Sequence, residues 1–109
     1  MTKEEILAME AGIKLDDAIH RQVMSKGEPS LIHPLPKYSA DISAVWPVME
    51  KMKENWDCIE LIWDVGAWDI NLENYETHQI FYLGKEAGET YEKLPEAICK
   101  VALLAKLHL

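Results

Sequence analysis

The sequence has few cysteines and no long apolar run, and both absences limit what the protein can be. Its two cysteines, Cys58 and Cys99, are too few for a disulfide framework and lack neighbours that would complete a zinc-binding pattern. We interpret both as reduced core residues. No segment reaches the roughly 18 uninterrupted apolar residues of a membrane helix. Residues 2–5 lack the basic start of a secretory signal, so we expect a cytoplasmic protein without membrane contact.

Basic side chains are also few. The formal net charge is −8, and Arg21 is the only arginine among eleven lysines and arginines. Affinity for nucleic acids comes mainly from clustered Lys and Arg that release counterions from phosphates. The composition therefore argues against direct binding to DNA or RNA. An acidic surface fits an inhibitor that presents DNA-like charge, although acidity more often serves solubility.

Recognisable catalytic motifs are missing as well. The sequence contains no glycine-rich phosphate loop, metal-ligand cluster or nucleophile motif. Its histidines are scattered over a predicted helix, a loop, a strand edge and the last residues: His20, His33, His78 and His108. A metal site needs three or four converging ligands, and no pair of the many carboxylates stands out as a general acid and base. We expect a non-enzymatic protein without catalytic residues, metal or cofactor.

The apolar residues that are present support one folded domain over residues 1–109, because 49% of the chain is hydrophobic. Thr2 and Glu5 have the spacing of a capping box, which predicts a helix start. Five residues at helical spacing predict one inward face for residues 3–25: Ala8, Ala11, Leu15, Ile19 and Val23. Asp16 is then expected to face water, and Gly12 is a point where this region can divide into two shorter helices.

Prolines at positions 29, 34 and 36 predict an extended surface loop over residues 28–38. Ser39 is the next N-cap candidate, for a helix over residues 40–54 with Asp41 in its first turn. The spacing of apolar residues predicts the inward face of this helix: Ile42, Val45, Trp46, Met49 and Met52. Pro47 lies late for a first-turn position, so a kink and a later start are both open alternatives.

The apolar period then changes from 3.6 to 2. Alternation predicts strands over residues 58–65, 68–73 and 79–83, with a short turn at Gly66 and Ala67. The polar segment 85–93 is either a loop or a weak edge strand. The predicted fold class is α+β, a single α/β sandwich domain in the order α-α-β-β-β-α. Its antiparallel sheet has three strands, or four if residues 85–93 pair, and is layered with helices.

The last predicted helix begins near Pro95 and is apolar nearly all the way round. On its polar side, Glu96 and Lys100 have the spacing of an ion pair. Leu103 and Leu107 continue that side, where a solvent-facing helix would carry polar groups. Either the first helix or the proline loop of the same chain covers them, or a second subunit does. We favour self-association through Leu103 and Leu107, with a two-fold dimer as the commonest form.

Aromatic side chains that can stack on a nucleobase are numerous for this length: Tyr38, Trp46, Trp56, Trp63, Trp68 and Tyr82. Of these, Trp46 and Trp63 are expected in the core. The candidate contacts for a phosphate-bearing ligand are Arg21, His33, Tyr38, Ser39 and Trp68. Asp41 counts against an anion near Ser39, because its carboxylate already occupies the positive end of the helix dipole.

Three segments together resemble the phage ABA sandwich domain family: Ala11–Asp16, Tyr38–Ile42 with Trp46, and Pro95–Ala105. The strand region matches in pattern alone. Members more often have threonine at the position of Ala40 and arginine at that of Lys100, and Pro47 is not expected. The resemblance implies a sheet layered between helices, encoded by a phage and acting in the host cytoplasm, with no established catalytic residues.

The resemblance also implies an accessory role against host processes such as defence. Our first hypothesis is a homo-oligomeric protein that binds and sequesters a nucleotide immune signal. The second is an acidic inhibitor or adaptor that holds a host protein through its acidic face and the side of Leu103 and Leu107. An enzyme is the third and weakest alternative.

Overall fold

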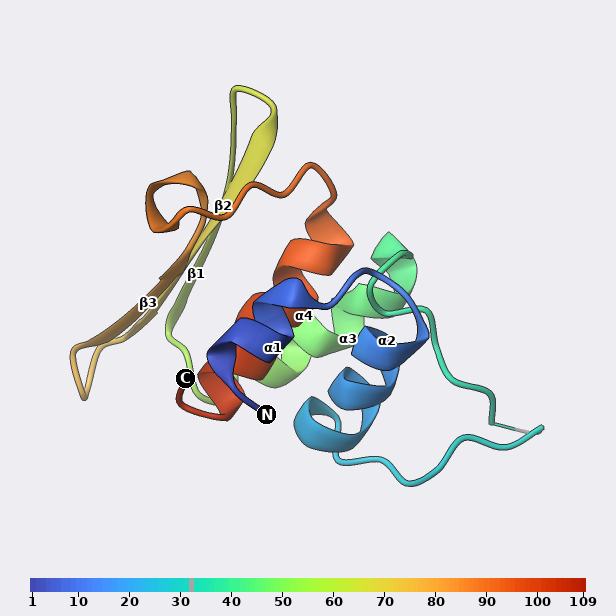
Figure 1. Ribbon diagram of the computed structural model, residues 1–109. Coiled ribbons are helices and arrows are strands. Elements are labelled where there is room, and N and C mark those ends of the chain that lie inside the picture. Colours follow the sequence, from blue (N-terminus) through green and yellow to red (C-terminus); the bar gives the residue numbers. More distant parts are fainter. Residues whose placement is uncertain (32) are drawn as a thin grey trace.

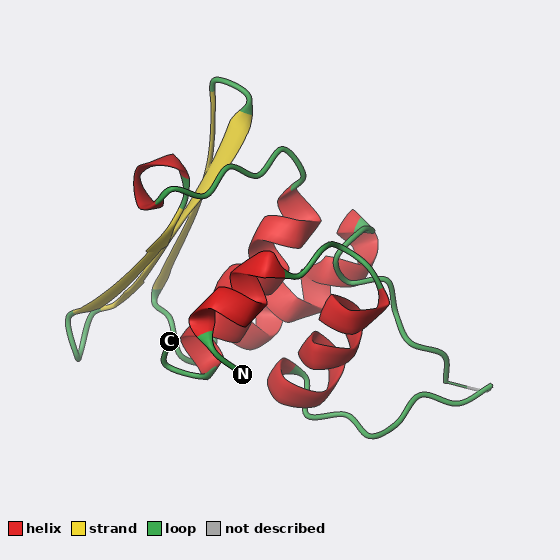
Figure 2. Cartoon of the chain, in the orientation of Figure 1, coloured by secondary structure: helices red, strands yellow, loops and turns green. Residues whose placement is uncertain are grey.

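The α-helices and the strands occupy separate sides of the molecule (Figures 1 and 2). The computed structural model describes residues 1–31 and 33–109. The elements follow in the order α1 (Lys3–Ala8), α2 (Ile13–Ala18), the π-helical turn η1 (Ile19–Val23), α3 (Ile42–Met52), β1 (Cys58–Asp64), β2 (Ala67–Asn74), β3 (Gln79–Leu83), the 3-10 turn η2 (Lys85–Ala87) and α4 (Leu94–Lys106). This confirms the predicted α+β class and the order of its elements.

The N-terminal region divides at Gly12, as one alternative predicted. Thr2 and Glu5 form the capping box that starts α1, with each side chain accepting a hydrogen bond at 3.1 Å from the other residue's amide. Gly12 has a φ of 149° and separates α1 from α2. Because the break changes the helical phase, Ala8 and Ala11 are exposed, contrary to prediction.

The helix predicted over residues 40–54 begins at Ile42, and its N-cap is Asp41 rather than Ser39. The Asp41 carboxylate accepts a hydrogen bond from the amide of Ser43 at 2.9 Å, which satisfies a free donor of the first turn. The start at Ile42 is two residues later than predicted, and Pro47 is the sixth residue of α3, still beyond its first turn.

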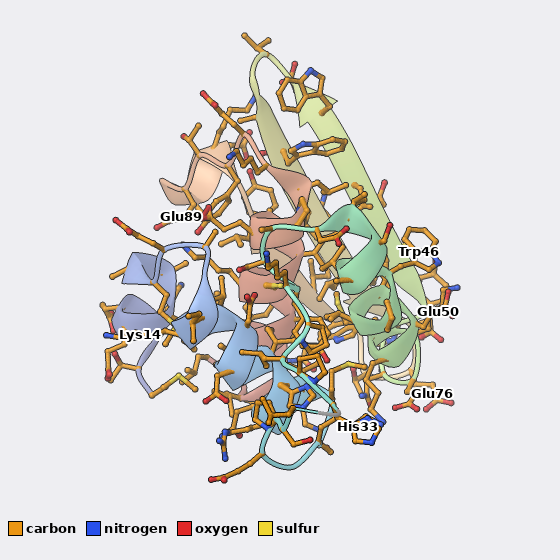
Figure 3. All side chains as sticks on the ribbon, turned by 90° about the vertical axis from the view of Figure 1, so that its right-hand side faces the viewer. Lys14, His33, Trp46, Glu50, Glu76 and Glu89 are labelled. Carbon is orange, nitrogen blue, oxygen red and sulfur yellow. The ribbon has the colours of Figure 1, made fainter. Side chains whose placement is uncertain are left out.

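Two tryptophans predicted for the core are on the surface. Trp46 on α3 is 54% exposed, because the buried side of this helix is formed instead by Val45, Val48, Met49 and Met52. Figure 3 shows the Trp46 side chain at the edge of the molecule. Trp63 is 53% exposed near the end of β1, where its ring packs edge-on against Trp68 at a centroid distance of 5.4 Å.

The three strands form an antiparallel sheet in the order β1, β2, β3. Residues directly opposite each other share a face, and the row of Leu61, Ile70 and Leu83 faces the helices, with Ile70 and Leu83 buried. The segment 85–93 is not a fourth strand. It contains η2, and one backbone bond joins it to β2, from the Trp68 amide to the Tyr91 carbonyl at 2.8 Å.

The helices α1 to α4 all lie on one side of this sheet (Figure 1), and α4 is the one that packs on it, through β2 and β3. The expectation of a sheet between two helical layers is therefore wrong for this chain. The opposite face carries the side chains that alternate with those of the inner face, and we call it the outer face: Cys58, Glu60, Ile62, Asp64, Ala67, Asp69, Asn71, Glu73, Ile80 and Tyr82. Its many polar side chains are typical of a sheet face that contacts water, and no α-helix of the described chain packs there.

The turn η2 touches one end of this outer face. The Asp69 carboxylate accepts a hydrogen bond from the amide of Lys85 at 3.1 Å, and the Tyr82 hydroxyl accepts one from the amide of Glu86 at 3.2 Å. Gly84 allows this approach, because a Cβ at that position would clash with both the Asp69 carboxylate and the Tyr82 hydroxyl.

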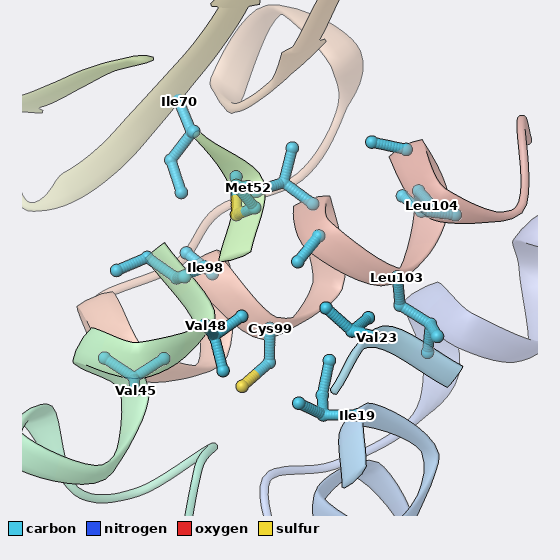
Figure 4. Packing of buried hydrophobic residues seen from close by; sticks show 14 of the residues in the cluster. Ile19, Val23, Val45, Val48, Met52, Ile70, Ile98, Cys99, Leu103 and Leu104 are labelled. Carbon is cyan, nitrogen blue, oxygen red and sulfur yellow. The ribbon is translucent and has the colours of Figure 1, made fainter. Parts of the chain in front are cut away.

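Helix α4 lies at the centre of the core (Figure 4). It contacts α1, α2, η1 and α3 on one side and β2 and β3 on the other, and every residue from Ala97 to Ala105 is buried. Leu103 is fully buried and Leu107 is partly exposed at the C-cap. The exposed leucine side on which self-association was predicted is therefore absent, because other segments of the same chain cover Leu103.

The polar residues of α4 are also used within the chain. Lys100 is buried, and its ammonium donates to the backbone carbonyl of Leu7 at 2.9 Å instead of pairing with Glu96. The Glu96 carboxylate accepts a hydrogen bond from the amide of Ala11 at 3.2 Å. Both side chains thus attach the first two helices to α4, and the predicted ion pair is absent.

Candidate functional site

Two predicted ligand contacts, Arg21 and His33, lie on the exposed surface. Arg21 pairs with Asp17 one turn earlier at 2.9 Å and with Glu28 at 3.8 Å. The hydrogen bond and charge of Asp17 raise the pKa of Arg21. His33 lies on the long loop before α3, where its amide donates to the Ser30 hydroxyl at 3.0 Å (Figure 3).

Two further predicted contacts, Tyr38 and Ser39, are buried and already bonded. The Tyr38 hydroxyl lies 2.9 Å from Nδ1 of His20, and burial raises the pKa of this phenol. The Ser39 amide and hydroxyl both donate to the Asp16 carboxylate, at 2.7 and 2.6 Å. Asp16 is buried rather than solvent-facing, because this pairing replaces its water contacts. These bonds fix the end of the loop on α2 and leave little for a ligand to contact.

A cavity with residues from several elements lies elsewhere, at the end of the molecule where α4 finishes. It has a volume of about 320 Å³. Its walls come from four parts of the chain: Val23 and Ser25 after η1; Lys51, Met52, Glu54, Asn55 and Trp56 at the end of α3; Asn74, Thr77 and Gln79 of the β2–β3 hairpin; and Ala102, Ala105, Lys106 and His108 of α4 and its C-cap. We call this cavity the terminal cleft. None of the five predicted ligand contacts lines it.

The terminal cleft has an apolar floor and a polar rim. Val23, Met52, Ala102 and Ala105 are buried and supply the floor. Trp56 is partly buried against the same core and adds an aromatic ring to the wall. An apolar floor with a few polar groups at the rim is the usual composition of a small-molecule site.

The hairpin wall of the terminal cleft is held in place by side-chain hydrogen bonds. The amide nitrogen of Asn74 donates to the Asn55 carbonyl at 2.8 Å, and the Asn74 oxygen accepts from the amides of Glu76 and Thr77 at 3.0 Å. The Asp57 carboxylate accepts from the amide of Tyr75 at 2.7 Å. These bonds tie the β2–β3 turn to the segment after α3, so the cleft wall is formed before any ligand binds.

Two side chains at the rim are free to donate hydrogen bonds to an anion. Lys51 pairs with Glu54 at 3.1 Å. Within the described chain, the side chains of Lys106 and His108 make no ion pair or hydrogen bond, and both are exposed. Both line the same cleft as the Trp56 ring, in a chain of net charge −8. They can donate to phosphate or carboxylate oxygens.

Sequence reasoning missed the terminal cleft because its four walls are far apart in the chain. One signal was available, since Lys106 follows five consecutive apolar residues, 101–105, at the final turn of this helix. Among residues 1–31 and 33–109, no three His, Cys, Asp or Glu side chains gather as metal ligands would. In the same residues, no helix combines the length and apolar character needed to cross a bilayer.

The family model of the phage ABA sandwich domain matches residues 4–103, nearly the whole length. The chain therefore belongs to the phage ABA sandwich domain family, which confirms the resemblance seen in its sequence. No curated protein and no solved structure matched the chain significantly.

Proposed function

We propose that this protein is a phage-encoded binding protein rather than an enzyme, and that it sequesters a nucleotide signal of host defence. The ligand class is an anion that carries a planar ring. The observation that supports this proposal best is the terminal cleft, which combines Trp56 with the unpaired Lys106 and His108 over an apolar floor.

The chemistry of the cleft matches the two halves of a nucleotide. The Trp56 ring offers a stacking surface for a base, a contact worth about 1–3 kcal/mol per base in single-strand binding proteins. Lys106 offers a charge-assisted hydrogen bond to phosphate oxygens, and the His108 ring offers an N–H donor. The Gln79 and Asn55 amides at the rim are available to recognise polar edges of the base.

Binding needs one copy of the chain, because all walls of the terminal cleft come from the same molecule. Self-association stays a prediction that no longer depends on Leu103. Sedimentation velocity at micromolar concentration tests it independently of ligand binding.

Isothermal titration calorimetry with a panel of cyclic dinucleotides and ADP-ribose derivatives tests the proposal. Adenosine and inorganic phosphate, each alone, separate the contributions of ring and charge. We expect at least one nucleotide to bind, and the Lys106→Gln variant to bind it about tenfold more weakly, a loss of about 1.4 kcal/mol. Lys26→Gln, on an exposed lysine outside the cleft, is the matched control.

Two results would overturn the proposal. One is the absence of measurable binding between the folded protein and every compound of the panel. The other is binding that Lys106→Gln and Trp56→Phe leave as strong as in the Lys26→Gln control, since the ligand would then sit outside the terminal cleft.

The alternative of an acidic inhibitor or adaptor loses part of its basis, because Leu103 is buried. The acidic surface that also motivated it remains, and the outer face of the sheet is its most distinct part.

A further inference from the structure

The outer face is a sheet surface that no α-helix of the described chain covers, and η2 contacts only its end at Asp69 and Tyr82. Ile62 and Ile80 on it are 42% and 65% exposed, whereas Ile70 on the inner face is fully buried. Neighbouring strands carry Glu60, Asn71 and Tyr82 in one row and Glu73 beside Ile80 in the next. The outer face thus presents two isolated apolar side chains among carboxylates and polar groups.

The charge of the outer face is mainly negative. Its carboxylates are Glu60, Asp64, Asp69 and Glu73, and within the described chain neither Glu60 nor Glu73 forms an ion pair. Asp64, at the β1–β2 turn, pairs with Lys85 of η2 at 3.0 Å. A second copy packed face to face would bring these carboxylates together, which is unfavourable in a low-dielectric interface.

The dimensions of the outer face suit one helix. Three strands about 4.8 Å apart span roughly 14 Å with their side chains, and the five residues 58–62 that η2 leaves uncovered on β1 span about 17 Å at about 3.3 Å each. A single α-helix is about 10–12 Å wide with side chains, and about 17 Å corresponds to about 11 residues. An extended segment would instead add to a strand edge, where free backbone groups are available.

We propose that the outer face binds an amphipathic helix of a partner protein whose lysines or arginines flank an apolar stripe. The apolar stripe covers Ile62 and Ile80, and the flanking cations reach Glu60 and Glu73. The outer face shares no residue with the terminal cleft, so this inference goes beyond the proposed ligand binding. A negative result for helix binding would leave the ligand proposal untouched, and the reverse is also true.

A synthetic helix-forming peptide of leucine and lysine, about 15 residues long with leucine at helical spacing, is the probe. Two control peptides accompany it, one with the same composition in scrambled order and one with glutamate in place of lysine. We expect the patterned cationic peptide to bind at least about tenfold more tightly than the scrambled one, measured by fluorescence anisotropy at about 0.15 M salt. The glutamate peptide is expected not to bind.

Methyl-labelled isoleucine NMR of the unaltered protein locates the peptide without any variant. We expect the signals of Ile62 and Ile80 to shift, and that of Ile13, an exposed isoleucine on α2, to stay unchanged. The double variant Glu60→Gln with Glu73→Gln is expected to weaken binding about fivefold or more, while Glu4→Gln with Glu5→Gln on α1 leaves it unchanged.

Several outcomes would overturn the inference. Equal binding of the scrambled peptide, or equal loss in the two glutamine pairs, would show general attraction to an acidic protein. Shifts at Ile13 rather than Ile62 would place the peptide elsewhere. A concentration-dependent dimer abolished by Ile80→Lys would make a second copy the occupant of the outer face.

Discussion

The ammonium group of Lys100 lies 2.9 Å from the backbone carbonyl oxygen of Leu7. This hydrogen bond joins α4 to α1 through two residues that are 93 positions apart in the sequence. The same ammonium lies 5.0 Å from the centre of the Tyr91 ring. Because Leu7 is in the last turn of α1, the cation also meets the negative end of that helix. A side chain of α4 therefore stabilises the end of α1 and contacts the segment that leads into α4.

Replacing Lys100 with methionine tests this attachment. The substitution keeps much of the apolar stem but removes the donor, so we expect the free energy of unfolding to fall by about 1–2 kcal/mol. Urea unfolding monitored by tryptophan fluorescence measures the change. Lys26→Met, on an exposed lysine, is the control and is expected to unfold like the unaltered chain. Equal stability of the two variants would mean that the hydrogen bond from Lys100 to the Leu7 carbonyl does not stabilise the folded chain.

Leu103→Ala distinguishes a core leucine from an interface leucine. Because Leu103 is fully buried within one chain, we expect a loss of about 2–5 kcal/mol from the cavity that remains. The loss is expected to be the same at low and high protein concentration, since a monomer's stability does not depend on concentration. Leu107→Ala, at a partly exposed site, is expected to cost less. If the loss of stability were larger in dilute protein, Leu103 would instead contribute to an interface between subunits.

Gly84→Ala tests the attachment of η2 to the outer face. An added Cβ would clash with the Asp69 carboxylate and the Tyr82 hydroxyl, so we expect η2 to shift and stability to fall by about 1–3 kcal/mol. Gly27→Ala is the matched control, because a Cβ there meets no atom within 4 Å. Amide signals of residues 85–87 measured by NMR report the shift of η2. Unchanged signals with full stability would show that the close approach is not required.

Stability at alkaline pH depends on the buried groups Cys99, Tyr38 and Tyr91. Burial raises the pKa of each above its ordinary value, which is 9.0 for the thiol and 10.0 for the phenols. Above those values the unfolded chain releases these protons while the folded chain retains them, so the free energy of unfolding falls as pH rises. We expect this stability to be fully present below about pH 9 and to be lost progressively above it.

Urea unfolding at a series of pH values from about 8 to 11 measures the alkaline loss. In Cys99→Ala the loss is expected to begin nearer the ordinary phenol value of 10.0 than the thiol value of 9.0. Cys58→Ala, which removes the partly exposed thiol, is the control. If Cys99→Ala and Cys58→Ala lose stability over the same pH range, the Cys99 thiol does not contribute.

Local signals in the sequence predict most of the fold. The capping box of Thr2 and Glu5, the break at Gly12 and the alternation of residues 58–83 all act between neighbours in the chain, and the structure confirms each of them. Layering is not a local property. The polar alternation of the outer face is compatible with either a bare or a covered sheet face, so the absence of a helical layer there could not be predicted.

Long-range pairings account for the errors. Asp16 is buried because it binds Ser39, 23 positions later, and Lys100 is buried because it binds Leu7. Neither partner is visible in helical spacing, which places both residues on polar sides. The terminal cleft was missed for the same reason, since its floor and rim meet only after four distant segments have packed together.

The central position of α4 has a consequence for the order of folding. Residues 94–106 are translated after every segment that packs on them. Until residues 94–106 leave the ribosome, α1, α3 and the strands lack the surface of α4 on which they pack. Their apolar side chains therefore remain exposed to water. The domain therefore closes after translation of its last helix, and a stalled chain that ends before residue 94 presents unfolded substrate to chaperones and proteases.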